Sequence, residues 1–368
     1  MHIGDEMTNK QIVDKILKKL EKEHINLYHD ITKEDILKYI ANIEGLNKMT
    51  DCQFDMEMLK LFASFKDAHT SYSVQRIPMD KMLTFIDGKF YVFDNEKWQE
   101  ISNFGRLRAS EIKKRLEPLV NYETEEWLNH SIKVMINNAY IYKMLELNDN
   151  EELCLTLLDG KKLHLHRQNR ENQTHIKPKA PYSFKLLNDN ILYFKYRGCW
   201  EDKDYSFSEF MKEITILIEK KQISNYILDL RDNTGGNSEI LNPFQHLVRD
   251  KNLNGVLLIN NGVFSSGRFA VARFKKEFNT PLIGKPTGGA AKSYGYTKPL
   301  EVLGKRFSAS TRLWDFSNIF GYEGAIQPDV LVNETIDDLQ NKKDIILETA
   351  IDHINKQKNN NKDFQRTL

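Results

Sequence analysis

Apolar residues recur at helical spacing through the first 65 residues of the chain. Thr8 and Thr50 are each followed three residues later by a glutamine, which is the capping-box pattern of a helix start. After the second cap, one helical face collects apolar side chains: Phe54, Met58, Leu61, Phe62 and Phe65. The pattern predicts an N-terminal helical region in which this stripe forms core.

Short alternation replaces the helical spacing from Leu83 onward. Apolar runs on either side of Asp87-Gly88 predict a β-hairpin, and a similar pair of runs surrounds Asp159-Gly160. Two helices are expected between the hairpins, over residues 109–120 and 123–147. These segments together predict one small mixed α+β module.

Helix and strand signals alternate beyond residues 168–181, a polar stretch with two prolines that we interpret as a linker. The expected strands are 191–196, 226–230, 255–259 and 281–283, and the expected helices are 206–220, 238–248 and 267–278. Such alternation favours an α/β domain with parallel strands and crossover helices.

Composition narrows the classes of function. The chain has 368 residues, and at ~150 residues per domain this length suggests two or three domains. Its 53 Lys+Arg residues nearly balance its 52 Asp+Glu residues, so no overall field attracts nucleic acid or an anionic membrane. No run approaches the ~20 apolar residues that span a bilayer, the first residues lack the apolar region of a signal peptide, and the three cysteines show no metal-ligand spacing. We therefore expect a protein without a membrane span or a nucleic-acid partner, located in the cytoplasm or exported with a leader that has been removed.

Three segments carry residues that suit chemistry. The strand over 226–230 is followed by a polar turn that contains Gly235-Gly236, where backbone N–H groups could face an anion or simply form a tight turn. Ser265 and Ser266 stand between a strand and a helix, where a serine is either an N-cap or a nucleophile. Glu323 lies between glycines and is either a loop acid or a partner that orients an imidazole.

Histidines are the candidate bases and metal ligands. His69 lies at the break between the helical and β regions, where it is either an idle loop residue or a general base. His164 and His166 alternate on a strand without a nearby carboxylate or cysteine, so we interpret them as one solvated face. The sequence predicts no metal site and no cofactor.

Taken together and in order, these segments resemble the tail-specific (C-terminal processing) serine peptidases, most closely their tricorn-like and retinoid-binding-protein-like branch. Five motifs between about residues 50 and 335 carry the resemblance: Asp67-Ala-His69-Thr70, Asp229-Leu-Arg231-Asp-Asn233-Thr-Gly235-Gly236, Phe264-Ser-Ser266-Gly267, Ile283-Gly-Lys-Pro-Thr287-Gly288-Gly289 and Glu323-Gly-x-x-x-Pro328-Asp329. The resemblance implies an α/β fold with a ClpP/crotonase-like catalytic core and an inserted PDZ-like module.

The resemblance also implies the domain boundaries. We expect an N-terminal helical region over 1–70, a degenerate PDZ-like module over 71–167, the linker at 168–181, the catalytic core over 182–335, and a C-terminal helix with a polar tail over 336–368. It implies cleavage of peptides or unstructured protein tails without a cofactor.

Roles carry over to individual residues. Ser266 matches the nucleophile, His69 the histidine base and Glu323 its orienting acid, with the N–H groups of Gly267 and of Gly235 or Gly236 holding the oxyanion. Ser266 is preferred to Ser265 because it directly precedes Gly267. The family usually has an acid after the nucleophile, where this chain has Gly267; the next residue, Arg268, either pairs with a substrate carboxylate or points to solvent.

Two alternatives stay open. A second branch of the family uses a Ser–Lys dyad, and Lys292, 26 residues after Ser266, is the candidate base for it. Residues 290–293 have the composition of an exposed segment, whereas a lysine base needs burial to lower its pKa. The other alternative is a binding protein that kept the fold and holds a peptide or small ligand without cleaving it. A crotonase-type acyl-CoA enzyme lacks support, because no basic cluster suits the CoA phosphates.

Overall fold

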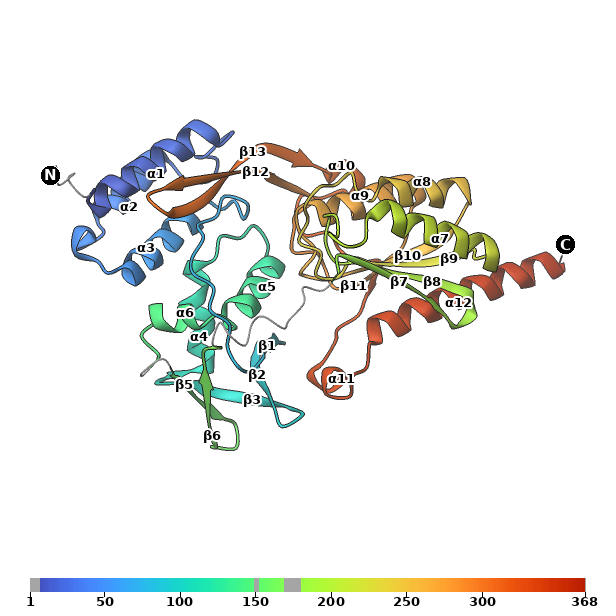
Figure 1. The fold of residues 1–368 in the computed structure, drawn as a ribbon, viewed down its shortest axis with the longest axis horizontal. Helices are drawn as coiled ribbons and strands as arrows, with labels where there is room; N and C mark the ends of the chain where they lie inside the picture. The colour runs from blue at the N-terminus through green and yellow to red at the C-terminus, as the bar shows by residue number, and fades with distance from the viewer. Residues whose placement is uncertain (1–6, 149–151, 169–179, 368) are drawn as a thin grey trace. The chain divides into compact units, whose positions relative to one another are not determined.

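The computed structural model describes residues 7–148, 152–168 and 180–367 of the chain. The chain divides into two compact units (Figure 1). Unit 1 comprises residues 1–175 and 292–315, and unit 2 comprises residues 176–291 and 316–368. The expected linker at 168–181 lies largely outside the described residues.

Unit 1 begins with the predicted helical region. The helices are α1 (Asn9–Glu23), α2 (Lys33–Ala41), the 3-10 turn η1 (Leu46–Lys48) and α3 (Asp51–Ala63). Both predicted capping boxes are present, at Thr8 before α1 and at Thr50 before α3. All five side chains of the predicted apolar stripe are buried, which confirms that the stripe is core.

The mixed module of unit 1 has both expected hairpins. Its strands are β1 (Leu83–Ile86), β2 (Lys89–Asp94), β3 (Lys97–Phe104), β4 (Leu107–Arg108), β5 (Glu152–Leu157) and β6 (Lys162–His166). They form one sheet in the order β1-β2-β3-β5-β6, with β4 paired to β3. The helices are α4 (Ala109–Leu116), the 3-10 turn η2 (Glu117–Leu119), α5 (Glu125–Met135) and α6 (Ala139–Met144).

The single helix expected over 123–147 is wrong, because the segment is two helices. The chain leaves the helix at Asn137 and Asn138, whose side chains bind backbone groups outside it. Asn138 accepts from the N–H of Tyr140 and so caps α6, while Asn137 pairs with both backbone groups of Leu83. Two consecutive asparagines compete with the helical backbone for hydrogen bonds, which is the physical reason for the break.

A long hairpin that the sequence did not predict completes unit 1. It consists of β12 (Lys292–Val302) and β13 (Lys305–Asp315), which pair antiparallel around Leu303-Gly304. Its apolar side chains Val302, Phe307 and Ala309 belong to the same core as α1 and α3. A segment expected within the catalytic core therefore packs with the N-terminal helices.

Unit 2 is a three-layer α/β structure. Its sheet has the order β14-β11-β10-β9-β8-β7, with β7 antiparallel and the others parallel. The strands are β7 (Tyr182–Leu187), β8 (Ile191–Tyr196), β9 (Asn225–Asp229), β10 (Asn254–Ile259), β11 (Leu282–Gly284) and β14 (Val330–Leu331). The expected parallel strands and crossover helices are confirmed.

Helices cover both faces of this sheet. The helices α7 (Phe207–Lys221), α8 (Asn242–Asp250) and α9 (Ser266–Phe278) share a large apolar core with one face. On the other face the first turns of α12 (Ile345–Thr367) pack against β8, β9, β10 and β11. The short elements η4 (Asn188–Asn190), α10 (Ser317–Phe320) and α11 (Ile336–Gln340) complete the unit. In the described part of the chain, no helix is both long and apolar enough to cross a membrane.

Candidate functional site

The two serines lie at the turn that joins β10 to α9 in unit 2. We call residues 263–267 the serine turn. The turn is held by Asn233, whose carbonyl accepts from the N–H of Phe264 at 2.9 Å. Asn233 is fully buried, and its side chain bonds the carbonyl of Tyr196 and the N–H of Gly235, each at 2.9 Å. The end of β9 thus fixes the start of α9 through one asparagine.

Ser265 has an unusual backbone conformation. Its φ of 47° and ψ of −123° lie outside the regions that side-chain-bearing residues favour. Such a conformation costs about 1–3 kcal/mol and persists where the surroundings impose it, often at functional sites. A strained serine between a strand and a helix is also the geometry that exposes a nucleophilic hydroxyl in other hydrolases. The hydroxyl of Ser265 makes no hydrogen bond to the described residues.

Ser266, by contrast, is the first residue of α9, and its hydroxyl is occupied. Its Oγ donates to the carbonyl of Gly236 at 2.6 Å. The hydroxyl that we predicted as nucleophile therefore ties α9 to the glycine loop after β9. Gly235 has φ of 107° and must be glycine, because a Cβ there would stand 2.6 Å from the Cβ of Ser265.

Two backbone N–H groups at the serine turn and at the glycine loop that Ser266 binds are available to hold an anion. The N–H groups of Ser266 and Gly236 bond no acceptor among the described residues. The N–H of Gly267 donates to the carbonyl of Phe264 at 2.8 Å, and that of Gly235 donates to Asn233 Oδ1. Of the three predicted oxyanion donors, Gly236 is thus the one whose N–H is not already used within the turn.

Arg268 and Lys292 are both less exposed than the sequence predicts. Arg268 is 0% exposed; its guanidinium donates to the carbonyl of Ala290 and lies over the rings of Phe269 and Phe316. Burial inside unit 2 argues against both a solvent-facing arginine and a substrate contact. Lys292 is the first residue of β12 and half-buried, and its neighbours Ala291 and Ser293 are buried, so this segment is not the exposed one we expected.

The polar residues at the end of β9 form a structural network. Asp229 is fully buried and pairs with Arg231 at 2.7 Å and Lys195 at 3.0 Å. Arg231 also binds Asp344 just before α12, at 2.7 Å. Burial alone would raise the pKa of Asp229, but its hydrogen bond from Arg231 and the charge of Lys195 lower it to about 2. These charges join α12 to the sheet, so this part of the motif serves the fold.

His69 lies in unit 1, in the turn that follows α3. We call residues 67–70 the histidine turn. The backbone N–H of His69 donates to Asp67 Oδ1 at 2.9 Å, and its carbonyl accepts from Ser308 of β13 at 2.7 Å. The predicted base is therefore fixed by the α3 turn and by the unpredicted hairpin.

Asp67 is the centre of the histidine turn. It is fully buried, and its Oδ2 accepts from His24 Nε2 at 2.8 Å and from Thr70 Oγ1 at 2.6 Å. Burial by itself would raise the pKa of Asp67, but the His24 hydrogen bond and the charge of His69 lower it to about 2. Asp67 is thus a carboxylate that stabilises positive charge around His69.

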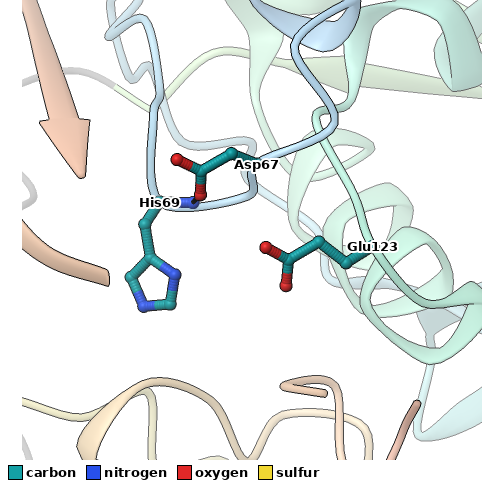
Figure 2. A group of neighbouring side chains, drawn as sticks. All are labelled: Asp67, His69 and Glu123. Atoms are coloured by element: carbon teal, nitrogen blue, oxygen red, sulfur yellow. Dashed lines mark hydrogen bonds between the residues drawn. The ribbon is translucent and has the colours of Figure 1, made fainter. Parts of the chain in front are cut away.

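Glu123, which the sequence did not single out, belongs to the same cluster. One ligand atom each of Asp67, His69 and Glu123 lie within 4.8 Å of one another. Figure 2 shows the Glu123 carboxylate pointing toward the imidazole from the segment before α5. No sequence motif marks Glu123; the nearest local signal is Thr124, the N-cap of α5, which fixes the start of that helix.

Glu323 lies in unit 2, in the exposed loop between α10 and β14. The neighbouring Ala325 pairs with Ala290, and the N–H of Ala291 donates to the carbonyl of Gly324 at 2.7 Å. The loop is therefore anchored to the segment after Thr287-Gly288-Gly289. Since Ser266 and Glu323 lie in unit 2 and His69 lies in unit 1, the Ser–His–Glu arrangement stays a prediction.

Comparison with known proteins identifies the fold. No family model and no curated protein matches the chain. Among solved structures, mature CPAF complexed with lactacystin is 10% identical, with a TM-score of 0.57 over 91% of this chain and 95% of that chain. A candidate peptidase from Parabacteroides merdae is 15% identical, with a TM-score of 0.52 over 94% of this chain and 96% of that chain. The tricorn protease is 14% identical, with a TM-score of 0.50 over 95% of this chain and 37% of that chain. The resemblance to the tail-specific peptidases is confirmed at the level of the mixed α/β fold.

Proposed function

We propose that the chain is a serine peptidase that cleaves peptides or unstructured protein tails through an acyl-enzyme. One observation carries the proposal: Ser265 is strained, and two N–H groups of the turns around it, on the next residue Ser266 and on Gly236, whose carbonyl binds the Ser266 hydroxyl, have no acceptor among the described residues. Such a combination suits acyl transfer, in which a hydroxyl attacks a carbonyl and the resulting oxyanion needs donors. The fold that the chain shares with the tricorn protease supports the same class of reaction.

The geometry leads us to propose Ser265 as the nucleophile in place of Ser266. The Ser265 hydroxyl is free of hydrogen bonds to the described residues, whereas the Ser266 hydroxyl donates to Gly236. Each candidate serine is followed by a residue whose N–H could hold the oxyanion. For Ser265 that residue is Ser266, whose N–H has no acceptor among the described residues, whereas for Ser266 it is Gly267, whose N–H already bonds Phe264. We keep Ser266 as the alternative nucleophile.

The proposed reaction proceeds in two stages. His69 takes the proton of the serine hydroxyl, the serine oxygen attacks the scissile carbonyl, and the N–H groups of Ser266 and Gly236 hold the oxyanion. The protonated imidazole then gives its proton to the leaving amine, and a water molecule hydrolyses the ester by the same steps. Each oxyanion donor contributes about 3–4 kcal/mol in comparable sites. The mechanism requires units 1 and 2 to bring His69 to the serine turn.

We also infer finer features of the architecture. Unit 2 is proposed to be a ClpP/crotonase-like core, which its six-stranded sheet between helical layers supports. The module over 71–167 is proposed to be a degenerate PDZ-like module that binds substrate. Glu323 is proposed to orient His69, as the resemblance implies.

Two other functions are kept as competitors. In a Ser–Lys enzyme, Lys292 is the base, and its half-buried place beside Ala291 and Ser293 suits a lysine of lowered pKa better than an exposed segment does. In a non-catalytic binding protein, the serine turn has no chemical role, and the strain at Ser265 is a feature of the fold alone.

A peptidase assay on an unstructured peptide, with product masses recorded, tests the proposal. We expect Ser265→Ala to lower kcat by at least about 10⁴-fold, because no nucleophile is left. Ser266→Ala loses one hydrogen bond worth about 1 kcal/mol and should lower kcat about fivefold. Full loss in Ser266→Ala with turnover in Ser265→Ala would return the role to Ser266. No cleavage by the wild-type chain of any unstructured peptide, in a form that folds normally, would favour the binding protein.

A further inference from the structure

The segment before α5 is fastened to the histidine turn. Asn121 donates through its amide to the carbonyls of Asp67 and Thr70, at 2.5 and 2.8 Å. On its other side, the ammonium of Lys66 lies 4.6 Å from the ring centre of Tyr122. Glu123 is the next residue. Its position beside His69 is therefore set by contacts that its neighbours make within unit 1 alone.

The carboxylates of Asp67 and Glu123, both near His69, make different contacts. Asp67 already accepts three hydrogen bonds, from the backbone N–H of His69, from His24 and from Thr70. Its oxygens build the turn. The carboxylate of Glu123 reaches in from outside the turn and points toward the ring itself (Figure 2).

We propose that Glu123 is a positioning residue for His69: it accepts a hydrogen bond from one ring N–H, leaves the other nitrogen to act as the base, and stabilises the imidazolium. The inference deepens the function proposed above and rests on it for the catalytic consequence. The placement of Glu123 beside His69 does not depend on that function, because a carboxylate that faces an imidazole fixes its tautomer in any reaction. The separation of up to 4.8 Å allows the hydrogen bond to tighten when substrate binds.

The side chains of Asp67, His69 and Glu123 could also bind a metal ion. The hydrogen bonds that Asp67 already accepts argue against a metal site. Three N–H or O–H donors already bind its two oxygens, so a cation would have to displace hydrogen bonds that hold the turn. One imidazole and one carboxylate would then remain, fewer than the three protein ligands usual in a catalytic zinc site.

Further residues of unit 1 lie near the cluster of Asp67, His69 and Glu123. His24 binds Asp67 from the end of α1, and Lys66 lies on the Tyr122 ring. On the hairpin side, Gly295 of β12 comes close to the ring, since a Cβ there would lie 3.6 Å from His69 Nε2. Its strand partner Arg312 lies over the rings of Tyr296 and Trp314.

NMR of the ring nitrogens of His69 tests the proposal directly, with a His69→Gln variant to assign the signals. In Glu123→Gln we expect the midpoint of imidazole protonation to fall by about one pH unit, because a nearby opposite charge is lost. We also expect the two neutral tautomers to become mixed. Glu123→Asp, which keeps the charge, should recover most of the midpoint. Glu125→Gln is the matched control, an exposed acid of α5 that lies 4.0 Å from the ammonium of Lys113, and it should leave the titration unchanged.

The peptidase assay tests whether Glu123 affects catalysis. Glu123→Gln should lower kcat about 10- to 100-fold with KM nearly unchanged, because the charge on the imidazole appears in the transition state. An unchanged His69 titration in Glu123→Gln would overturn the proposal, even if the wild-type chain cleaves peptides. A shifted titration in a chain that cleaves no peptide would keep the placement of Glu123 and remove the peptidase. Stoichiometric Zn²⁺ binding by the wild-type chain, lost in Glu123→Gln, would overturn the positioning role in favour of a metal site.

Discussion

The serine turn of unit 2 and the histidine turn of unit 1 are built in opposite ways. Backbone hydrogen bonds and glycines hold the serine turn, around the buried amide of Asn233 and the tight approach of Gly235 to Ser265. Charged side chains hold the histidine turn, around the buried carboxylate of Asp67. One turn offers oriented N–H groups and a strained hydroxyl; the other offers an imidazole between carboxylates.

The difference matches the two needs of acyl transfer. An oxyanion is best held by fixed neutral donors, which cost no reorganisation when charge appears. A base that becomes positively charged is best surrounded by negative charge. The comparison also shows that a low pKa does not identify a site: Asp67 and Asp229 both have pKa values lowered to about 2, but Asp229 joins α12 to the sheet. What surrounds the carboxylate decides its role.

Among changes to the histidine turn, removing His69, the proposed base, should have the largest effect. We expect His69→Ala to lower kcat/KM by about 10³- to 10⁴-fold, because the serine hydroxyl then has no proton acceptor. Lys292→Ala should lower it less than threefold. In the wild-type chain kcat/KM should rise with pH as the imidazole loses its proton. Full activity in His69→Ala together with loss in Lys292→Ala would transfer the role of base to the lysine.

Breaking the network of Asp229 tests the claim that it serves the fold. Arg231→Gln should lower the free energy of unfolding by about 3 kcal/mol, near the lower end for a broken buried pair because Lys195 still contacts Asp229. Arg249→Gln removes an exposed pair with Glu277 and should cost less than about 1 kcal/mol. Urea denaturation measures both. An Arg231→Gln chain as stable as the wild type would show that this network contributes nothing.

The sequence allowed most of unit 2 to be predicted. Its strands are continuous apolar runs, its helices carry a stripe, and Ser206 caps α7 through a capping box. The hairpin β12–β13 was not predicted for two reasons. Its strands are rich in exposed polar residues. Its turn also places Leu303 at positive φ, whereas the β1–β2 turn has Asp87 there, a residue typical of turns.

The candidate site was predictable in part. His69 and the pair Ser265-Ser266 stand out from their places between elements. Which serine is strained depends on backbone angles, and no residue type encodes the φ of Ser265. Glu123 lies 54 residues beyond His69, and its position depends on the bonds that Asn121 makes to the histidine turn. A contact between side chains so far apart follows from the fold, which single-sequence patterns do not give.

The two glutamates provide a sharper comparison between the units. If Glu323 orients His69, Glu323→Gln should lower kcat about 100-fold and raise KM less, because the lost charge acts on the imidazolium. If the two acids act on the same imidazole, the double variant Glu123→Gln/Glu323→Gln should lose less than the product of the single losses. Wild-type kcat in Glu323→Gln would leave Glu323 as a loop acid and Glu123 as the partner of His69.

A smaller effect than these is predicted on acid stability. Because the pKa of Asp67 is lowered from 3.8 to about 2 on folding, its stabilisation is present above about pH 4 and is lost as pH falls toward 2. The loss amounts to about 2 kcal/mol, because a tenfold change in proton affinity is worth about 1.36 kcal/mol. Asp67→Asn should therefore flatten the fall in unfolding free energy between pH 4 and about 2. The same curve in Asp67→Asn and in the wild type would contradict the assigned role of Asp67; Asp14→Asn, which removes an exposed pair with Lys10, is the control.

Labelling with a phosphonofluoridate tests the central claim most directly, because the reagent reacts with an activated serine hydroxyl and needs no knowledge of the substrate. We predict one adduct per chain, mapped by peptide mass spectrometry to Ser265, absent in Ser265→Ala and greatly slowed in His69→Ala. An adduct on Ser266 would move the nucleophile by one residue. A folded wild-type chain that takes up no label would contradict the serine peptidase itself.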